Sequence, residues 1–169
     1  MNLKGESMKN ILVGIVMGSE SDLTTMIDSQ KILQEFGVES EIKILSAHRT
    51  PDLAADYAKS AKEKGLKVLI AGAGMANHLA GAMAAHTILP VIGVPLDASP
   101  LSGLDALLST VQMPPGIPVA CVAVGKAGSK NAAYLALHIL ALGNASIEKK
   151  LEDFRKKNRE KVIKKNEEL

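Results

Sequence analysis

The sequence has almost no aromatic side chains: among 169 residues there are two Tyr, two Phe and no Trp. A hydrophobic core must therefore be built from Ala, Val, Ile, Leu and Met. Proteins that bind RNA loops or single strands usually stack bases on aromatic rings. The scarcity of aromatics argues against that class, and it also weakens a flavin site, because little is available to stack on the ring.

Cysteine and net charge are scarce as well. Cys121 is the single cysteine, which excludes an intrachain disulfide framework and a cysteine-cluster zinc site. A reducing cytoplasm is the natural location of such a chain. The formal net charge of +2 provides no overall field that would attract nucleic acid or an acidic membrane.

Charge is missing altogether from two long stretches, residues 68–96 and 106–125. Both are long enough to cross a bilayer. The first, however, contains Asn77, His78 and His86, the second contains three prolines, and no aromatic belt flanks either. Buried elements of a parallel sheet produce similar apolar runs, so we expect no membrane span. Residues 1–9 are too polar and too few for a secretion signal.

Apolar runs of strand length alternate with helical patterns along the chain. The runs predict strands over residues 11–17, 38–45, 68–71, 90–94 and 118–124, and the intervening segments predict helices. This alternation predicts a three-layer α/β/α sandwich with a five-stranded parallel sheet, of the flavodoxin-like or Rossmann-like type. Ligands in such folds bind at the carboxyl ends of the strands.

The composition changes near the C-terminus. Residues 148–169 carry nine Lys or Arg and six Asp or Glu, while Ile147, Leu151, Phe154 and Val162 continue an apolar helical stripe. Because acidic residues are interleaved throughout, we expect a charged amphipathic helix packed on its own domain or on a neighbouring subunit, rather than a nucleic-acid or membrane arm. The chain is thus predicted to be a single domain (1–169), with a core over about 10–143 and a helical extension over about 146–169.

The turn after the first predicted strand reads Gly-Ser-Glu-Ser-Asp over residues 18–22. A strand, a glycine turn and a helix start present backbone N–H groups to a phosphate, with the hydroxyls of Ser19 and Ser21 beside them. Asp22 is suited to accept hydrogen bonds from ribose hydroxyls. The alternative is that Ser21 or Asp22 merely caps the following helix.

The turn after the second predicted strand places His48 beside Arg49, just before the Thr50-Pro51 helix start. Arginine keeps its charge and binds phosphate or carboxylate in bidentate fashion. Histidine titrates near neutral pH and can transfer protons. The alternative is a solvent-exposed polar turn.

The segment after the third predicted strand, residues 71–81, opens like a dinucleotide fingerprint but has Asn77 at the third glycine position. Its small residues favour close backbone approach to a compact ligand. His78 is either a second polar contact or a histidine that caps the next helix. His86 and His138 lie on apolar stretches and are expected to be structural; no metal-binding spacing occurs. Lys126 is either a charge contact at the same sheet edge or a solvated lysine.

Taken together, these segments resemble one enzyme family, the N5-carboxyaminoimidazole ribonucleotide mutases of purine biosynthesis. The resemblance runs in register from about residue 11 to residue 142. The motifs that carry it are MGSESD (17–22), SAHRTPD (46–52), AGAG (71–74) with His78-Leu79, LPVIGVP (89–95), VQMP (111–114), and AG (127–128) with NAA (131–133).

The resemblance implies transfer of a carboxylate from the exocyclic nitrogen to ring carbon C4, through release and recapture of CO2. It implies no ATP, no metal and no organic cofactor. It also implies a homo-octamer whose subunits share sites and whose C-terminal helices pack across one another. In this family residues 72–78 wall the CO2 pocket. The matching site positions are His48 for proton transfer and Ser19, Ser21, Asp22, Ser46, Arg49, Gly72, Gly74, His78 and Leu79 for substrate binding.

The sequence departs from the usual family loop, Gly-Gly-Ala-Ala-His-Leu-Pro-Gly. Here Met75 adds bulk, Asn77 adds polarity near the expected CO2 pocket, and Ala80 replaces a stiffening proline. These changes leave open a sister activity, direct carboxylation of aminoimidazole ribonucleotide with CO2, although the retained His78-Leu79 and VQMP segments favour the mutase. A flavodoxin-like module that binds a nucleotide or flavin without catalysis is the alternative from another class.

Overall fold

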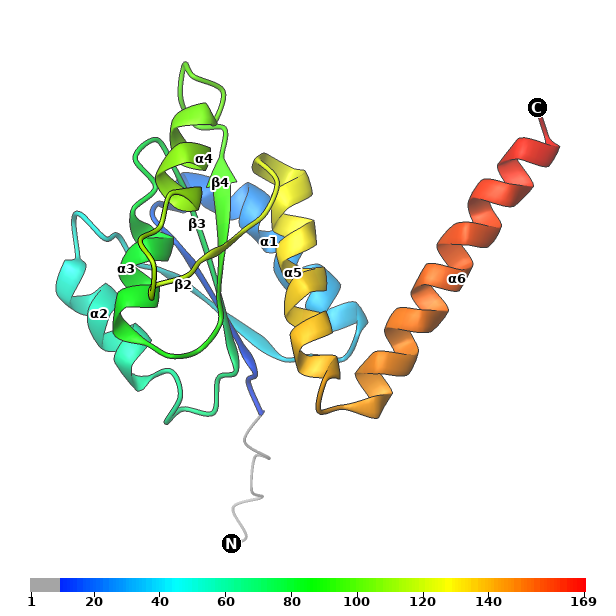
Figure 1. Cartoon of the computed structure of the whole chain (residues 1–169), viewed down its shortest axis with the longest axis horizontal. Coiled ribbons are helices and arrows are strands. Elements are labelled where there is room, and N and C mark those ends of the chain that lie inside the picture. Colours follow the sequence, from blue (N-terminus) through cyan, green and yellow to red (C-terminus); the bar gives the residue numbers. More distant parts are fainter. Residues whose placement is uncertain (1–9) are drawn as a thin grey trace, which may run out of the picture.

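The computed structural model describes residues 10–169, so the prediction about a secretion signal in residues 1–9 lies outside the described residues. Strands and helices alternate along the chain (Figure 1). The strands are β1 (Val13–Met17), β2 (Ser40–Ile44), β3 (Val68–Gly74), β4 (Val91–Leu96) and β5 (Ala120–Cys121). The helices are η1 (Glu20–Asp22, a 3-10 turn), α1 (Leu23–Glu35), α2 (Pro51–Ser60), α3 (Leu79–His86), α4 (Leu104–Val111), α5 (Gly125–Ala141) and α6 (Ala145–Glu167).

The five strands form one parallel sheet in the order β2-β1-β3-β4-β5. β1 pairs with β2 on one side, where Met17 lies opposite Ile44, and with β3 on the other, where Met17 lies opposite Gly72. The chain therefore leaves β1 first toward one edge of the sheet and later toward the other. Such a reversal is the switch point at which open α/β sheets bind ligands.

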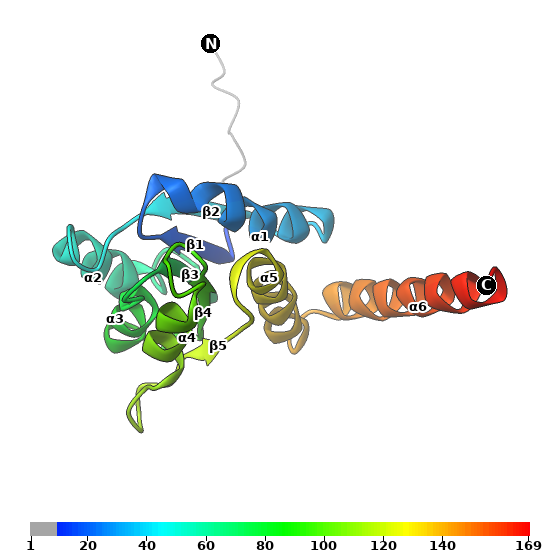
Figure 2. The same cartoon turned by 90° about the horizontal axis from the view of Figure 1, so that it is seen from above.

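Helices cover both faces of the sheet, which confirms the three-layer α/β/α sandwich. Viewed from above, α1 and α5 lie on one face and α2, α3 and α4 on the other (Figure 2). Each face has its own apolar cluster, one containing Met26 and Leu137 and the other containing Leu79 and Met83. The two clusters are almost entirely aliphatic, as the scarcity of aromatic residues requires.

The first charge-free run is folded into the sheet. It supplies β3, α3 and β4, and the strand residues from Val68 to Ala71 and from Val91 to Leu96 are buried. Strands covered by helices on both faces have no polar side, which accounts for the continuous apolar sequence. Among the described helices, none combines the length and the apolar character that a bilayer span requires.

The fifth strand is shorter than predicted, and the helix after it begins earlier. Only Ala120 and Cys121 pair with β4, where the prediction placed a strand over residues 118–124. α5 then starts at Gly125, whereas the sequence pattern predicts a helix over residues 129–142. Glycines in the first turn of a helix lower its intrinsic helix propensity. At Gly128, however, a Cβ atom would collide with the carbonyl group of Ala123, so glycine is what allows the helix to begin there.

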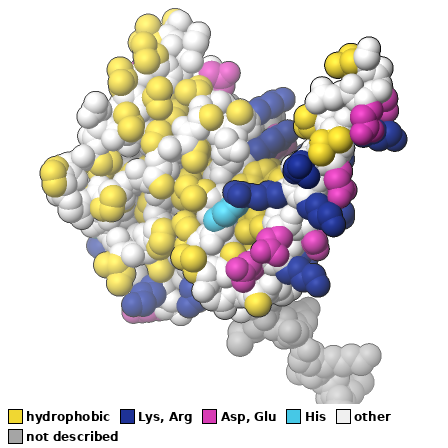
Figure 3. Space-filling model, turned by 45° about the vertical axis from the view of Figure 1, so that its right-hand side comes forward, with side chains coloured by type: hydrophobic (Ala, Val, Ile, Leu, Met, Phe, Trp, Pro, Cys, Tyr) yellow, Lys and Arg dark blue, Asp and Glu magenta, His cyan; other side chains and the backbone are white. Residues whose placement is uncertain are grey.

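α6 projects away from the sheet (Figures 1 and 3). Asn144 caps its N-terminus, because the side-chain oxygen accepts hydrogen bonds from the backbone N–H groups of residues 146 and 147. Ile147 and Leu151 are buried, and the ring of Phe154 stacks on Tyr134 of α5 at 4.9 Å. Val162, by contrast, is 63% exposed. Ile147, Leu151 and Phe154 of the predicted apolar stripe therefore pack on the domain that contains the sheet, whereas Val162 does not.

Candidate active site

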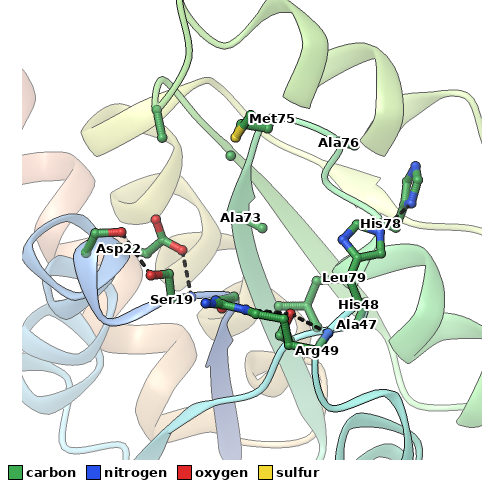
Figure 4. Close-up of a pocket in the computed structure, with 15 residues that line it drawn as sticks. Ser19, Asp22, Ala47, His48, Arg49, Ala73, Met75, Ala76, His78 and Leu79 are labelled. Carbon is green, nitrogen blue, oxygen red and sulfur yellow. Dashed lines mark hydrogen bonds between the residues drawn. The ribbon is translucent and has the colours of Figure 1, made fainter.

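A cavity of about 500 Å³ lies where the carboxyl ends of β1, β2 and β3 meet. Small-molecule sites in proteins occupy roughly 300–1,000 Å³. Figure 4 shows Ser19 and Asp22 on one side of the cavity, His48 and His78 on the other, and Arg49 at its base. All but one of the predicted site residues line it: Ser19, Ser21, Asp22, Ser46, His48, Arg49, Gly74, His78 and Leu79.

The turn after β1 is held together by its own polar groups. The backbone N–H of Ser19 donates to Oδ2 of Asp22 at 3.1 Å, and the hydroxyl of Ser21 donates to the hydroxyl oxygen of Ser19 at 3.1 Å. Asp22 thus closes the turn that precedes α1 but makes no side-chain cap bond to α1 itself, which was the alternative role left open by the sequence. Its side chain also lines the cavity. One carboxylate oxygen orders the turn while the other remains available to a ligand.

Burial makes ionisation of the Asp22 carboxyl group unfavourable. The side chain is buried among the walls of the cavity, and this desolvation raises the pKa of its carboxyl above the ordinary value. The hydrogen bond from the Ser19 backbone and the positive charge of Arg49 oppose the shift only in part. Hydrogen-bond donors of a ligand that reach this carboxyl group would therefore stabilise its ionised form.

We expect Asp22→Asn to stabilise the unliganded protein while weakening ligand binding. Because the folded-state pKa of Asp22 lies above the unfolded value, the ionised carboxylate lowers stability progressively as pH rises through that window. Asparagine cannot ionise, so the variant is expected to melt higher than the wild type at pH 7, by about 2–4 °C per kcal/mol relieved. The difference is expected to shrink toward pH 4. Thermal melts of both proteins at pH 7 and pH 4 test this. The prediction is contradicted if the gain in melting temperature over the wild type is smaller at pH 7 than at pH 4.

The turn after β2 closes on itself through Ser46 and Thr50. The backbone N–H of Ser46 donates to the Thr50 hydroxyl at 3.0 Å, and that hydroxyl donates to the Ser46 carbonyl at 3.2 Å. Thr50 precedes α2 as predicted but makes no side-chain cap bond, because its hydroxyl is engaged with Ser46. The resulting rigid turn presents its intervening residues, 47–49, to the cavity.

Arg49 links the two turns across the cavity. Its Nε donates to the Ser46 hydroxyl at 3.4 Å, and its Nη2 donates to the carbonyl oxygen of Gly18. These bonds fix the guanidinium between β1 and β2, close enough to Asp22 to influence that carboxyl. The remaining guanidinium donors form a preorganised positive site suited to a phosphate or carboxylate.

His48 and His78 are brought together from loops thirty residues apart. Nε2 of His48 lies 2.9 Å from Nδ1 of His78, and the two rings meet edge to face at 4.9 Å between centroids. A single proton shared between these nitrogens makes one ring the donor and the other the acceptor. The sequence left His78 open between a polar contact and a helix-capping histidine. The structure places it in the cavity wall, partly open to solvent, with no side-chain cap bond.

Gly72 and Asn77 lie away from the cavity, whereas Ala98 joins it. Gly72 is buried in β3, and a Cβ atom there would meet the side chain of Met26, so glycine at this position leaves room for that side chain. Asn77 is fully buried and turned into the core, so it adds no polarity to the pocket. Ala98, just beyond the end of β4, was missed by the sequence analysis. No local sequence pattern pointed to Ala98, because its contact with the loop after β3 is tertiary: a Cβ at Gly74 would lie 2.6 Å from the Ala98 methyl carbon.

The other polar candidates from the sequence do not join the site. His86 ends α3, outside the cavity, and His138 on α5 lies within hydrogen-bonding distance of Arg155 on α6 at 3.1 Å. Lys126 is exposed in the first turn of α5 and does not line the cavity. Within residues 10–169, no three His, Cys, Asp or Glu side chains are grouped as a metal site would require.

These features define a flavodoxin-like α/β protein with an anion-receptive cavity and a histidine pair at its switch point. The chain belongs to the AIR carboxylase family, whose model matches residues 12–161.

Similar proteins cover nearly the whole chain. An N5-carboxyaminoimidazole ribonucleotide mutase of Pyrococcus horikoshii is 56% identical over 158 residues, which are 94% of this chain and 88% of the relative. The protein of the same name from Bacillus subtilis is 50% identical over 158 residues, 94% of this chain and 98% of the relative. The crystal structure of Treponema denticola PurE superposes with a TM-score of 0.84 at 31% identity, covering 94% of this chain and 98% of that one.

Proposed function

We propose that this chain is an isomerase of purine biosynthesis, a 5-(carboxyamino)imidazole ribonucleotide mutase. It moves the carboxylate of its ribonucleotide substrate from the exocyclic nitrogen to C4, giving 4-carboxy-5-aminoimidazole ribonucleotide. Relatives bearing this name match at 50–56% identity over nine-tenths of the chain. The single observation that carries the proposal is the cavity, which brings together the Arg49 guanidinium, the Asp22 carboxylate and the His48–His78 pair.

The ribonucleotide is held along the β1–β2 edge of the cavity. The hydroxyls of Ser19 and Ser21 and the Arg49 guanidinium bind the phosphate, because these donors converge at the start of a helix. The buried carboxylate of Asp22 accepts hydrogen bonds from the ribose hydroxyls. Ser46 keeps Arg49 in place through its hydroxyl. This arrangement directs the imidazole ring toward the histidine pair on the opposite wall.

His48 transfers the proton in both halves of the reaction. Loss of CO2 leaves electrons on the exocyclic nitrogen, and His48 donates a proton to it. C4 of the ring then attacks CO2, and His48 removes the proton from C4, which restores the aromatic ring and the protonated histidine. No proton is gained or lost over the cycle. His78, at 2.9 Å, orients the His48 ring for these transfers.

CO2 is retained by the apolar part of the cavity. Ala73, Gly74, Ala76 and Leu79 line that wall, together with the backbone that leads to His78. A small apolar compartment excludes the water that would otherwise dilute the released gas. Met75, which is 60% exposed at the rim, narrows the entrance of the compartment.

Direct carboxylation of aminoimidazole ribonucleotide is the second candidate, because the matching family model is that of AIR carboxylase. Both reactions share the carboxylated product and the same histidine chemistry. A binding module for flavin is disfavoured, since no Phe, Tyr or Trp is among the residues that line the cavity. A purified protein without absorbance near 450 nm would agree with this.

We expect the N-carboxylated ribonucleotide to be turned over far more efficiently than aminoimidazole ribonucleotide with bicarbonate, without ATP or added metal. Formation of the C4-carboxylated product is to be measured for both substrates side by side, with a protein-free control for spontaneous loss of CO2. Higher kcat/KM for the decarboxylated ribonucleotide with bicarbonate would replace the mutase assignment with the carboxylase. Product from neither substrate would remove the enzyme assignment.

A homo-octamer in the cytoplasm is the setting we propose for this activity. Apolar side chains are exposed along α4, at Leu104, Leu108 and Val111, and the second half of α6 projects away from the sheet (Figure 1). Both surfaces favour association between copies of the chain. Sedimentation velocity of the purified protein tests the assembly.

A further inference from the structure

We propose that Asn77 and Thr110 form a buried clamp that positions His78 for the reaction. Asn77 lies in the loop that joins β3 to α3, directly before His78, and Thr110 lies on α4. The inference rests on the proposed function, because it assigns a kinetic role to two residues that do not line the active-site cavity. In this role they are positioning residues, acting on the substrate only through His78.

Two hydrogen bonds tie the Asn77 side chain to the body of the protein. Its Nδ2 donates to the Thr110 hydroxyl oxygen at 2.9 Å and to the backbone carbonyl of Val94 on β4 at 3.3 Å. Asn77 is 0% exposed and Thr110 is 1% exposed. Water cannot replace these bonds as it would at the surface, so each one constrains the loop more strongly.

The hydroxyl of Thr110 sets the direction of the clamp. Thr110 donates its proton to the carbonyl of Ala106, one helical turn earlier, at 2.7 Å. Its oxygen can therefore only accept from Asn77, which must present its amide nitrogen. Oδ1 of Asn77 is then left without a hydrogen-bond partner among residues 10–169. A buried oxygen without a hydrogen-bond partner costs about 1–3 kcal/mol of stability. Because the chain nevertheless has this amide, we infer that Asn77 serves the position of the loop rather than overall stability.

Close packing of α4 on β4 brings the Thr110 hydroxyl within hydrogen-bonding distance of Asn77. A Cβ atom on Gly93 of β4 would collide with Cγ2 of Thr110. Glycine at this strand position therefore lets α4 approach the sheet closely enough for the Thr110 hydroxyl to reach Asn77. The clamp thus connects the loop after β3 to β4 and to α4 at the same time.

The loop has little else to hold it. Met75 has a left-handed backbone, with φ of 55°, which costs a non-glycine residue about 1–2 kcal/mol. The backbone bonds within the loop span only two residues, from the N–H of Asn77 to the Met75 carbonyl and from the N–H of His78 to the Ala76 carbonyl. Met75 and Ala76 are exposed, so burial does not anchor them. Asn77 is the side chain of this segment that reaches the core.

Releasing the clamp is expected to lower kcat rather than substrate affinity. The phosphate and ribose contacts come from the turns after β1 and β2, which the clamp does not touch. His78 would lose its fixed distance to His48, and misplacement of about 1 Å in a catalytic constellation can cost up to 100-fold. We therefore expect Thr110→Val to lower kcat by about 10–100-fold with KM changed less than about threefold.

The test compares three substitutions on α4 in the full-length protein, with the N-carboxylated ribonucleotide as substrate. Thr110→Val removes the acceptor with little change of shape, and Thr110→Ser retains it. Ser109→Ala removes a neighbouring hydroxyl that makes the same type of bond, to the Asp105 carbonyl at 2.7 Å, but does not reach Asn77. We expect the valine variant to be impaired and the serine and Ser109 variants to keep wild-type kcat. Wild-type kcat in Thr110→Val, or equal losses in Thr110→Val and Thr110→Ser, would overturn the proposal.

Asn77→Ala provides a second route in case Thr110→Val does not fold. This substitution removes the hydrogen bonds of the clamp and also the buried Oδ1 that lacks a partner. Because these two effects on stability oppose each other, the melting temperature is expected to stay close to that of the wild type. A kcat lowered at near-constant KM supports the clamp, and unchanged kcat overturns it. If wild-type protein itself forms no product, the proposed function fails. If the wild type is active and the variants match it, only the clamp fails.

Discussion

Replacing His48 with asparagine is expected to reduce kcat by about 10²–10⁴-fold, the range associated with loss of a general acid–base group. Asparagine is similar in size and polar, but it cannot accept and release a proton near neutral pH. In the proposed binding mode, the phosphate and the ribose are held by Ser19, Asp22 and Arg49, which line the cavity. Binding of the carboxylated product is therefore expected to change less than about threefold.

The matched control for His48→Asn is His86→Asn. His86 is also exposed but ends α3, outside the cavity. Steady-state kinetics and calorimetric titration with the product separate turnover from binding for both variants. Wild-type turnover in His48→Asn would remove this residue from the mechanism. Loss of product binding in parallel with kcat would assign it to binding instead.

Replacing Arg49 with alanine is expected to lower kcat/KM by about two powers of ten. Two charge-assisted hydrogen bonds to the substrate, at about 1.5 kcal/mol each, correspond to roughly 3 kcal/mol. The substitution also removes the bond to the Gly18 carbonyl, which ties the turns after β1 and β2 together. Most of the loss is expected in KM, because a phosphate anchor holds the substrate in the ground state and in the transition state alike.

Arg49→Lys separates charge from geometry. Lysine keeps the positive charge but lacks the planar fork that reaches Ser46, Gly18 and a phosphate together. We expect it to recover only part of kcat/KM. Lys59→Ala, which removes an exposed cation from the far end of α2, serves as the control and is expected to behave as the wild type. Full recovery by lysine would show that charge alone binds the substrate.

Much of the candidate site was predictable because of the sheet topology. Polar residues that directly follow buried strands must lie at one edge of a parallel sheet, so the sequence alone predicts one site for Asp22, His48 and Arg49, and all three line the cavity. The resemblance to known mutases added roles, and the family match confirms that relationship. The role of each residue stays a prediction until the variants are measured.

Other features were not predictable from local sequence. The pattern of residues 118–124 indicated a full strand, yet pairing with β4 ends after Cys121. The sequence predicts that Asn77 adds polarity near the pocket. In the structure its amide is buried against Thr110, 33 residues away in the sequence. Contacts of this kind depend on how closely α4 and the sheet approach, which no periodicity records.

By itself, the sequence determined the strand and helix alternation, the aliphatic core and the turns that carry polar groups, because these follow from the pattern of neighbouring residues. The tertiary structure alone decided which distant groups meet. It placed His48 2.9 Å from His78, turned Asn77 inward and Gly72 against Met26, and directed the second half of α6 away from the sheet (Figure 1). The physical reason is that packing at ångström precision depends on the summed shapes of whole layers, whereas local patterns specify only which face of each element is buried.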